Sequence, residues 1–107
     1  METETLLEPK ETEKVDVEAK EPNMWFVILH NDNVTTMDFV IMILIKLFHK
    51  SAEEAAEIML QIHNKGKAVA GRYPFEIAEE KMNTVLRTAS AYGFPLQATI
   101  EEDTGNA

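Results

Sequence analysis

The run NMWFVILH, residues 23–30, restricts the fold of this chain more than any other segment. It is rich in aromatic and β-branched side chains, which favour strands, and it is apolar at both odd and even positions. A strand with apolar side chains on both faces is typical of a sheet that neighbouring elements cover on both sides. We therefore predict a well-covered first strand here, with the folded part of the chain beginning at Asn23.

The residues before this strand have a different composition. Residues 1–22 contain eight acidic residues, three lysines and two prolines, but no aromatic residue. Such a segment buries too little apolar area to offset the entropy lost on ordering. We expect a flexible tail over 1–22 and one domain over 23–107, a length that can bury a modest core without disulfides or a structural metal.

Composition also narrows the classes of function. The chain has no cysteine, which excludes thiol nucleophiles and fits a reducing, cytoplasmic location. The longest purely apolar run, residues 39–45, is too short to cross a bilayer, and the acidic N-terminus does not resemble a secretion signal. The net charge of −9 opposes contact with phosphate backbones. Neither a membrane nor a nucleic acid is therefore an expected partner.

Periodicity and capping signals predict three helices. Thr35 is a candidate N-cap for the first helix, which would run to about residue 50 with Asp38 in its first turn. Ser51 and Glu54 form a capping box for the second helix, which should end at Gly66. The third helix should begin near residue 74, a proline, and end at residue 93, a glycine.

Two further strands complete the pattern. The sequence KAVAG, residues 67–71, predicts a brief strand, and RYP, residues 72–74, a turn. Near the C-terminus apolar and polar residues alternate over residues 96–101, which indicates a strand with one face in water. The order strand, helix, helix, strand, helix, strand predicts a small α+β domain with helices packed on a sheet.

The first helix has more apolar surface than one core face needs, because Ile41, Met42 and Ile45 add to its regular apolar stripe. One interpretation is that the second helix covers this excess. The alternative is that the chain is a scaffold domain that docks a protein partner there, with a purely structural polar loop.

The loop after the first strand suggests recognition of a small cation. Asn31 and Asp32 stand where a strand ends, and His63 projects from the second helix beside Met59 and Ile62. Asp32 offers charge, Asn31 a carbonyl oxygen, and a neutral His63 a ring nitrogen, and an ammonium group needs three such acceptors. The structural alternatives are local turns at Asn31 and Asp32 and a packed histidine.

Catalysis is less well supported by the same residues. No serine or cysteine accompanies this loop, so a nucleophile would have to be Thr35 or Thr36. A metal-dependent hydrolase would have to draw its ligands from dispersed residues, His30, Asp32, Asp38 and His63. We expect no catalytic residue, no metal and no cofactor.

Four segments, VILHNDNVTTMDFV, IMLQIHNKGKAVAG, EIAEEKMNTV and GFPLQATIEED, resemble the ClpS family over residues 24–102. The resemblance implies a βααβαβ domain with a three-stranded antiparallel sheet packed by three helices. It implies an adaptor, not an enzyme, that recognises N-degrons, proteins beginning with a bulky hydrophobic residue such as Leu, Phe, Tyr or Trp. The adaptor would deliver them to the ClpA unfoldase of the ClpAP protease, which would engage the tail.

The resemblance also implies roles for individual residues. Asn31, Asp32 and His63 would bind the α-amino group and adjacent backbone of the substrate, with Thr35 at the same mouth. Met37 would act as a shape gate against β-branched residues. The pocket for the first side chain would be lined by Leu29, Met37, Val40, Met59, Ile62 and Leu96. The chain departs from the family pattern at Asn33, where the family usually has a second Asp, and at Thr36 and Pro74.

Overall fold

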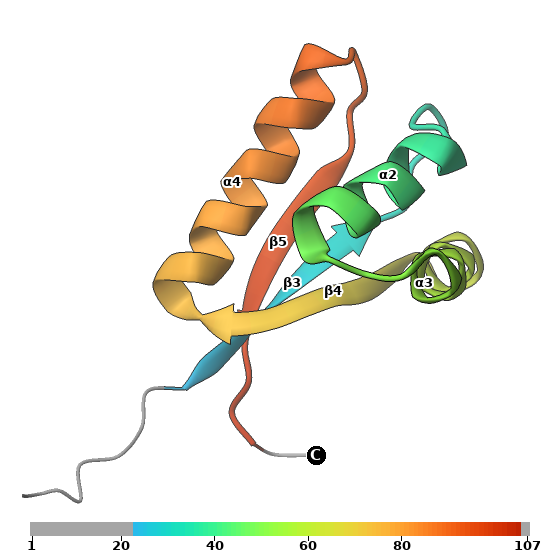
Figure 1. Cartoon of the computed structure of the whole chain (residues 1–107). Coiled ribbons are helices and arrows are strands. Elements are labelled where there is room, and N and C mark those ends of the chain that lie inside the picture. The colour runs from blue at the N-terminus through green and yellow to red at the C-terminus, as the bar shows by residue number, and fades with distance from the viewer. Residues whose placement is uncertain (1–22, 106–107) are drawn as a thin grey trace, which may run out of the picture.

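The computed structural model describes residues 23–105. The tail predicted over residues 1–22 lies outside the described residues. The elements follow the predicted order, βααβαβ, and their bounds are β3 (Met24–His30), α2 (Met37–Phe48), α3 (Ala52–Lys65), β4 (Lys67–Pro74), α4 (Phe75–Ala91) and β5 (Gln97–Glu102) (Figure 1). The prediction of a small α+β domain is confirmed.

The sheet is antiparallel throughout, with β3 between β4 and β5. Leu29 on β3 lies opposite Ala68 on β4 and Ala98 on β5. The pairing of β3 with β4 shifts by one residue between Val27 and Ile28. This shift is a β-bulge, which bends the strand and increases its twist.

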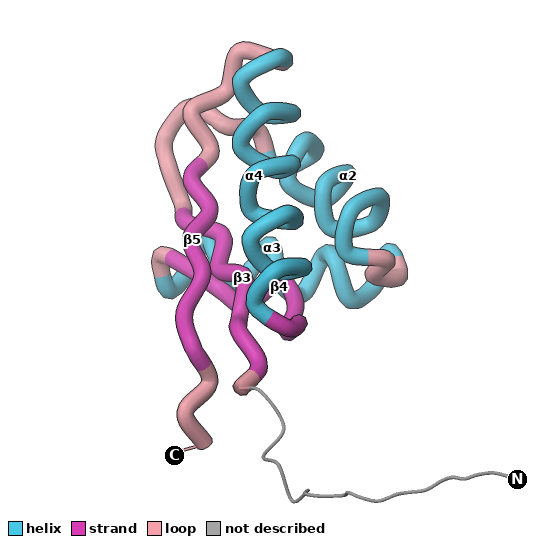
Figure 2. Tube along the Cα trace, turned by 90° about the vertical axis from the view of Figure 1, so that its left-hand side faces the viewer, coloured by secondary structure: helices cyan, strands magenta, loops and turns pink. Residues whose placement is uncertain are grey.

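The helices cover one face of the sheet. Figure 2 shows α4 and α2 on the same side of the three strands. On this inner face Val27, Leu29, Ala68 and Ala98 are buried, whereas side chains on the opposite, outer face such as Lys67, Val69 and Thr99 are exposed. The prediction of a well-covered first strand is nevertheless confirmed for β3 itself, because on its outer face Ile28 is only 7% exposed and Phe26 is half-buried.

The start of α2 differs from the prediction. Thr36, not Thr35, is the N-cap, and its hydroxyl oxygen accepts a hydrogen bond from the backbone N–H of Phe39 at 3.2 Å. Thr35 does not cap the helix, because its backbone N–H and its hydroxyl both donate hydrogen bonds to Asp32. The helix ends at Phe48, two residues earlier than predicted, where His49 adopts a left-handed conformation.

The second helix agrees closely with its capping signals. Ser51 and Glu54 form the predicted capping box, and Gly66 ends α3 with φ of 92°.

The predicted turn at residues 72–74 is wrong, because Arg72 and Tyr73 pair with Phe26 and Trp25 and extend β4 to Pro74. The predicted alternation near the C-terminus is confirmed in β5.

The apolar excess of α2 is mostly packed within the domain. Ile41 and Met42 are half-buried against the core, and only Ile45 of these three residues is exposed. Among the described elements, α3 is the main packing partner of α2. Within residues 23–105, no helix has both the length and the apolar character needed to cross a bilayer.

Candidate functional site

The candidate site lies where the end of β3 meets the end of α3. The backbone N–H of Asn31 donates to the carbonyl oxygen of Gly66 at 2.8 Å, directly after the pairing of His30 with Lys67. Gly66 caps α3, and His63 stands in the last turn of that helix. Antiparallel pairing and a glycine cap therefore hold the strand-end loop beside the helical turn that carries His63.

Asp32 organises the loop. Its Oδ1 accepts hydrogen bonds from the backbone N–H groups of Val34 at 2.8 Å and Thr35 at 2.7 Å, and its Oδ2 accepts one from the Thr35 hydroxyl at 2.7 Å. Partial burial acts to raise the pKa of Asp32, but the hydrogen bonds from Thr35 and Val34 outweigh it and hold that pKa below its usual value. Asp32 is thus an anion at neutral pH, and each oxygen retains accepting capacity. The local-turn interpretation holds for this residue.

The other two polar groups are free of such contacts. Within residues 23–105, the side chains of Asn31 and His63 form no hydrogen bond, and both are exposed. His63 directly follows Ile62, which is 1% exposed, so the border between core and solvent runs between these neighbours. Polar groups at such a border can bind a ligand without breaking an existing hydrogen bond.

The residues predicted to line a side-chain pocket belong to the hydrophobic core. One core cluster contains Leu29, Val40, Met59, Ile62 and Leu96, each at most 5% exposed. Met37 differs, because it opens α2 and is 44% exposed. Phe39 anchors this first turn of α2 through contacts with Phe94 and Tyr92, at ring centroid distances of 4.8 and 5.1 Å. Met37 therefore stands at the exposed start of α2, three residues before Val40 of the core cluster.

This arrangement supports binding chemistry better than catalysis. Among the described residues, no group of three or more His, Asp or Glu side chains is placed to hold a metal ion. His30 is engaged elsewhere, since its Nε2 lies 2.8 Å from the Thr99 hydroxyl oxygen on the outer face of the sheet. The loop and α3 instead bring one carboxylate, one amide and one imidazole to the same end of the fold.

Sequence reasoning missed a second feature, a groove on the outer face of the sheet with a volume of about 510 Å³. Phe26, Ile28 and Val69 supply apolar side chains to this outer groove, with Gln61 of α3, Lys67 and residues 101–104 around them. One sequence feature is consistent with this groove. The β3 segment is apolar at both odd and even positions, so it places apolar side chains on the outer face as well as on the face that the helices cover.

Comparisons with known proteins give a consistent family. The model of the family "ATP-dependent Clp protease adaptor protein ClpS" matches residues 20–99. The ATP-dependent Clp protease adapter protein ClpS of Desulforapulum autotrophicum is 46% identical over 100 residues, which cover 94% of this chain and 96% of the relative. The protein of the same description from Lawsonia intracellularis is 52% identical over 83 residues, 78% of this chain and 76% of the relative.

A solved structure agrees with these relatives. Agrobacterium tumefaciens ClpS2, bound to L-phenylalaninamide, superposes with a TM-score of 0.75 and 31% sequence identity. The superposition covers 78% of this chain and 100% of that one.

Proposed function

Because this chain belongs to the ClpS family of ATP-dependent Clp protease adaptors, which are not enzymes, we propose that it recognises N-degrons and delivers them to a ClpA-type unfoldase. The proteins it binds would begin with Leu, Phe, Tyr or Trp. The observation that carries the proposal is the 2.8 Å hydrogen bond from Asn31 N–H to the Gly66 carbonyl, which ties the polar loop to the turn of His63. The ligand of the ClpS2 relative supports it, since L-phenylalaninamide has a free α-amino group, a bulky side chain and an amide in place of the next peptide bond.

The α-amino group would bind at Asn31, Asp32 and His63. Such a group has a pKa near 8 and is mostly protonated at neutral pH, so it offers three N–H donors and a positive charge. Asp32 supplies the counter-charge, while the Asn31 carbonyl and a neutral imidazole of His63 supply the remaining acceptors. The hydroxyl of Thr35 keeps the Asp32 carboxylate in position.

The first side chain of the substrate would enter the apolar cluster beneath this corner. The cluster is closely packed, so entry requires side chains that can move without large strain. Met37 and Met59 meet this requirement, since methionine is unbranched and has three rotatable side-chain bonds. Met37, exposed at the surface, would act as the gate, with Leu29, Val40, Ile62 and Leu96 as fixed walls.

Recognition would depend on both features together. Burial of a Leu or Phe side chain contributes on the order of 1.5–3 kcal/mol, and micromolar affinity needs about 8 kcal/mol. The amine and the backbone contacts would have to supply the rest. An internal Phe has no ammonium group and would leave the three polar side chains unsatisfied, which disfavours its binding.

Delivery would involve the unfoldase and residues 1–22, which we propose as the segment that the unfoldase engages. We further propose that the adaptor acts in the cytoplasm, in keeping with the absence of cysteine. A direct test uses a fluorescent reporter that begins with Phe, degraded by ClpAP with and without the adaptor. We expect faster degradation with it and no effect on a reporter that begins with Ser. Equal rates for the two reporters would contradict N-degron delivery.

Peptide recognition is tested separately by anisotropy. A labelled peptide beginning Phe-Leu should bind, and its N-acetylated form should bind at least about 100-fold more weakly, because acetylation removes the charge and two donors. Equal binding of the two peptides would instead support the scaffold interpretation, in which the loop is purely structural.

A further inference from the structure

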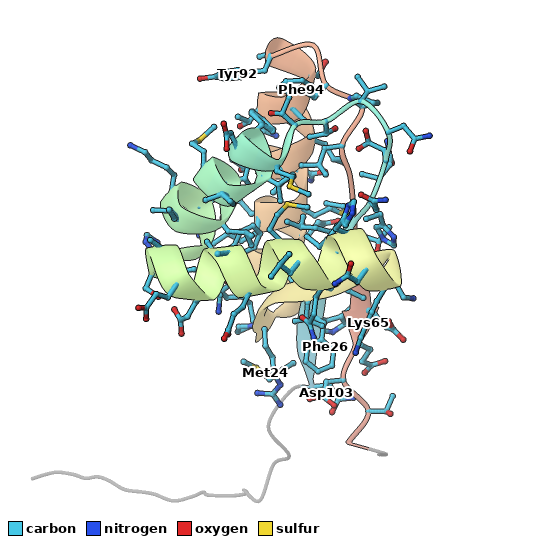
Figure 3. All side chains as sticks on the ribbon, turned by 90° about the vertical axis from the view of Figure 1, so that its right-hand side faces the viewer. Met24, Phe26, Lys65, Tyr92, Phe94 and Asp103 are labelled. Atoms are coloured by element: carbon cyan, nitrogen blue, oxygen red, sulfur yellow. The ribbon has the colours of Figure 1, made fainter. Side chains whose placement is uncertain are left out.

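The outer groove has an apolar floor on the face of the sheet opposite to the helix-covered face, and among the described helices only α3 borders it, through Gln61. Ile28 pairs with Val69 of β4 and Thr99 of β5, and Phe26 of the same strand is half-buried. Ile28 is 7% exposed, whereas Val69 is 44% exposed. Figure 3 shows Met24, Phe26 and Asp103 on one side of α3 and Tyr92 and Phe94 on the other. The floor of the groove and the candidate site's apolar cluster lie on opposite faces of the sheet, because Ile28 and Val69 face outward whereas Leu29 is buried on the inner face.

We propose that residues 14–20 of this same chain, KVDVEAK, dock as an extended segment in the outer groove. Val15, Val17 and Ala19 alternate with charged residues, so an extended conformation would direct all three apolar side chains to one face. A strand such as β3, with apolar side chains on both faces, is typical of a sheet that is covered on both sides. The apolar face of the extended segment would cover the outer side.

The position of the chain makes this segment the natural occupant. Residues 1–22 lead directly into Asn23, whose side chain donates a hydrogen bond to Glu102 at one end of the groove. At that same end the N–H of Asp103 donates to the Met24 carbonyl at 2.8 Å. A reversal at residues 21–22, Glu-Pro, would return the chain along β3, and seven extended residues span about 23 Å. Tethering also gives the segment an effective concentration in the millimolar range.

The segment is electrically neutral, because its two lysines and two acidic residues cancel, although residues 1–22 as a whole are acidic. The groove is bordered by Glu101, Glu102 and Asp103, which repel a neutral segment less than an acidic one. After a reversal at residues 21–22, Lys20 would lie opposite Asn23 and close to Glu102.

Docking is compatible with the composition of residues 1–22. A segment that cannot bury enough apolar area by itself can become ordered on a preformed apolar surface. No ligand is required, so the proposal can fail while the proposed recognition of N-degrons stands, and the reverse also holds.

The test is limited trypsin digestion of the full chain, followed by mass spectrometry. Cleavage after Lys14 and Lys20 should be at least about fivefold slower than cleavage after Lys10, which lies in residues 1–22 but outside the docked segment. Equal rates at the three lysines would overturn the proposal.

Two pairs of variants locate the contact. Val69→Asp should raise cleavage after Lys14 and Lys20 to the Lys10 rate, whereas Ile77→Asp, at an equally exposed position on α4 (45% against 44%), should not. Within the docked segment, Val17→Asp should abolish the protection of Lys14 and Lys20. The control Leu7→Asp, outside that segment, should not. Identical effects within either pair would overturn the assignment, and protection that disappears on dilution would indicate a second copy of the chain instead.

Discussion

Replacing Asp32 by Asn should separate the charge of this residue from its role in the loop. An asparagine Oδ1 can still accept from the N–H groups of Val34 and Thr35, and its Nδ2 can donate to the Thr35 hydroxyl once that hydroxyl reverses. The loop should therefore keep its conformation. The substitution removes only the counter-charge for a bound ammonium group.

The expected loss of affinity follows from the geometry of the carboxylate. At about 4 Å and an effective dielectric constant of about 20, the attraction between Asp32 and an ammonium is about 4 kcal/mol. Asp32 is half-exposed, so water screens part of this, and a hydrogen bond to a charged group contributes about 1.5–3 kcal/mol net. Asp32→Asn should weaken binding of a Phe-first peptide about 10- to 100-fold.

The assay is fluorescence anisotropy at pH 7 with matched controls. Glu53→Gln removes the same charge from the opposite end of α3, about 15 Å from His63 along the helix, and should change affinity less than about twofold. The melting temperature of Asp32→Asn should stay near that of the unsubstituted chain. Unchanged peptide affinity in a folded Asp32→Asn variant would refute the assignment of the amine to this carboxylate.

Three further predictions concern the gate, pH and the glycine cap. Met37→Ala should admit peptides that begin with Ile or Val, and unchanged selectivity in a peptide series would rule out the gate. Lowering the pH from 7 to 5 should weaken binding, since histidines ordinarily gain a proton near pH 6.5 and a protonated ring cannot accept from an ammonium. Asp32, with its lowered pKa, keeps its charge over this range, so His63→Gln should bind equally at both pH values, and a persistent decline would contradict the role of His63. Gly66→Ala places a side chain at φ of 92°, which should lower the free energy of unfolding by about 1–2 kcal/mol. Calorimetry should show a melting temperature lower by roughly 4–8 °C per kcal/mol, and an unchanged melting temperature would contradict this strain.

Local signals predicted those parts of the fold whose determinants are close in sequence. The capping box at Ser51 and the glycine cap at Gly66 need only residues within one turn, so α3 was predicted accurately. The N-cap of α2 was misassigned because Asp32 competes for Thr35, which capping preferences alone do not reveal. Residues 72–74 were misread as a turn because their strand conformation depends on pairing with Trp25 and Phe26, about 47 residues away in the sequence.

The candidate site shows the same division. Residue chemistry predicted that Asn31, Asp32 and His63 form an ammonium-binding set, and the structure brings the loop and the helix end together through Gly66. The roles assigned within that set remain predictions. The apolar cluster was inferred from family resemblance, because Leu29 on β3, Val40 on α2 and Leu96 just before β5 are distant in the sequence and no local pattern connects them. The outer groove was missed because the apolar pattern of β3 on both faces does not tell which face of the sheet the helices cover.

In the proposed function, an N-terminal amine and its side chain bind at the junction of β3 and α3. Titration of L-phenylalaninamide into the isotopically labelled full chain, with amide and methyl resonances followed by NMR, would locate the ligand. We predict shifts at Asn31, Asp32, Thr35 and His63 and at the methyl groups of Met37, Val40, Met59 and Ile62, with none from N-acetyl-phenylalaninamide at the same concentration. Shifts confined to Phe26, Ile28 and Val69, or equal shifts from the two compounds, would show that the amine does not bind at this junction.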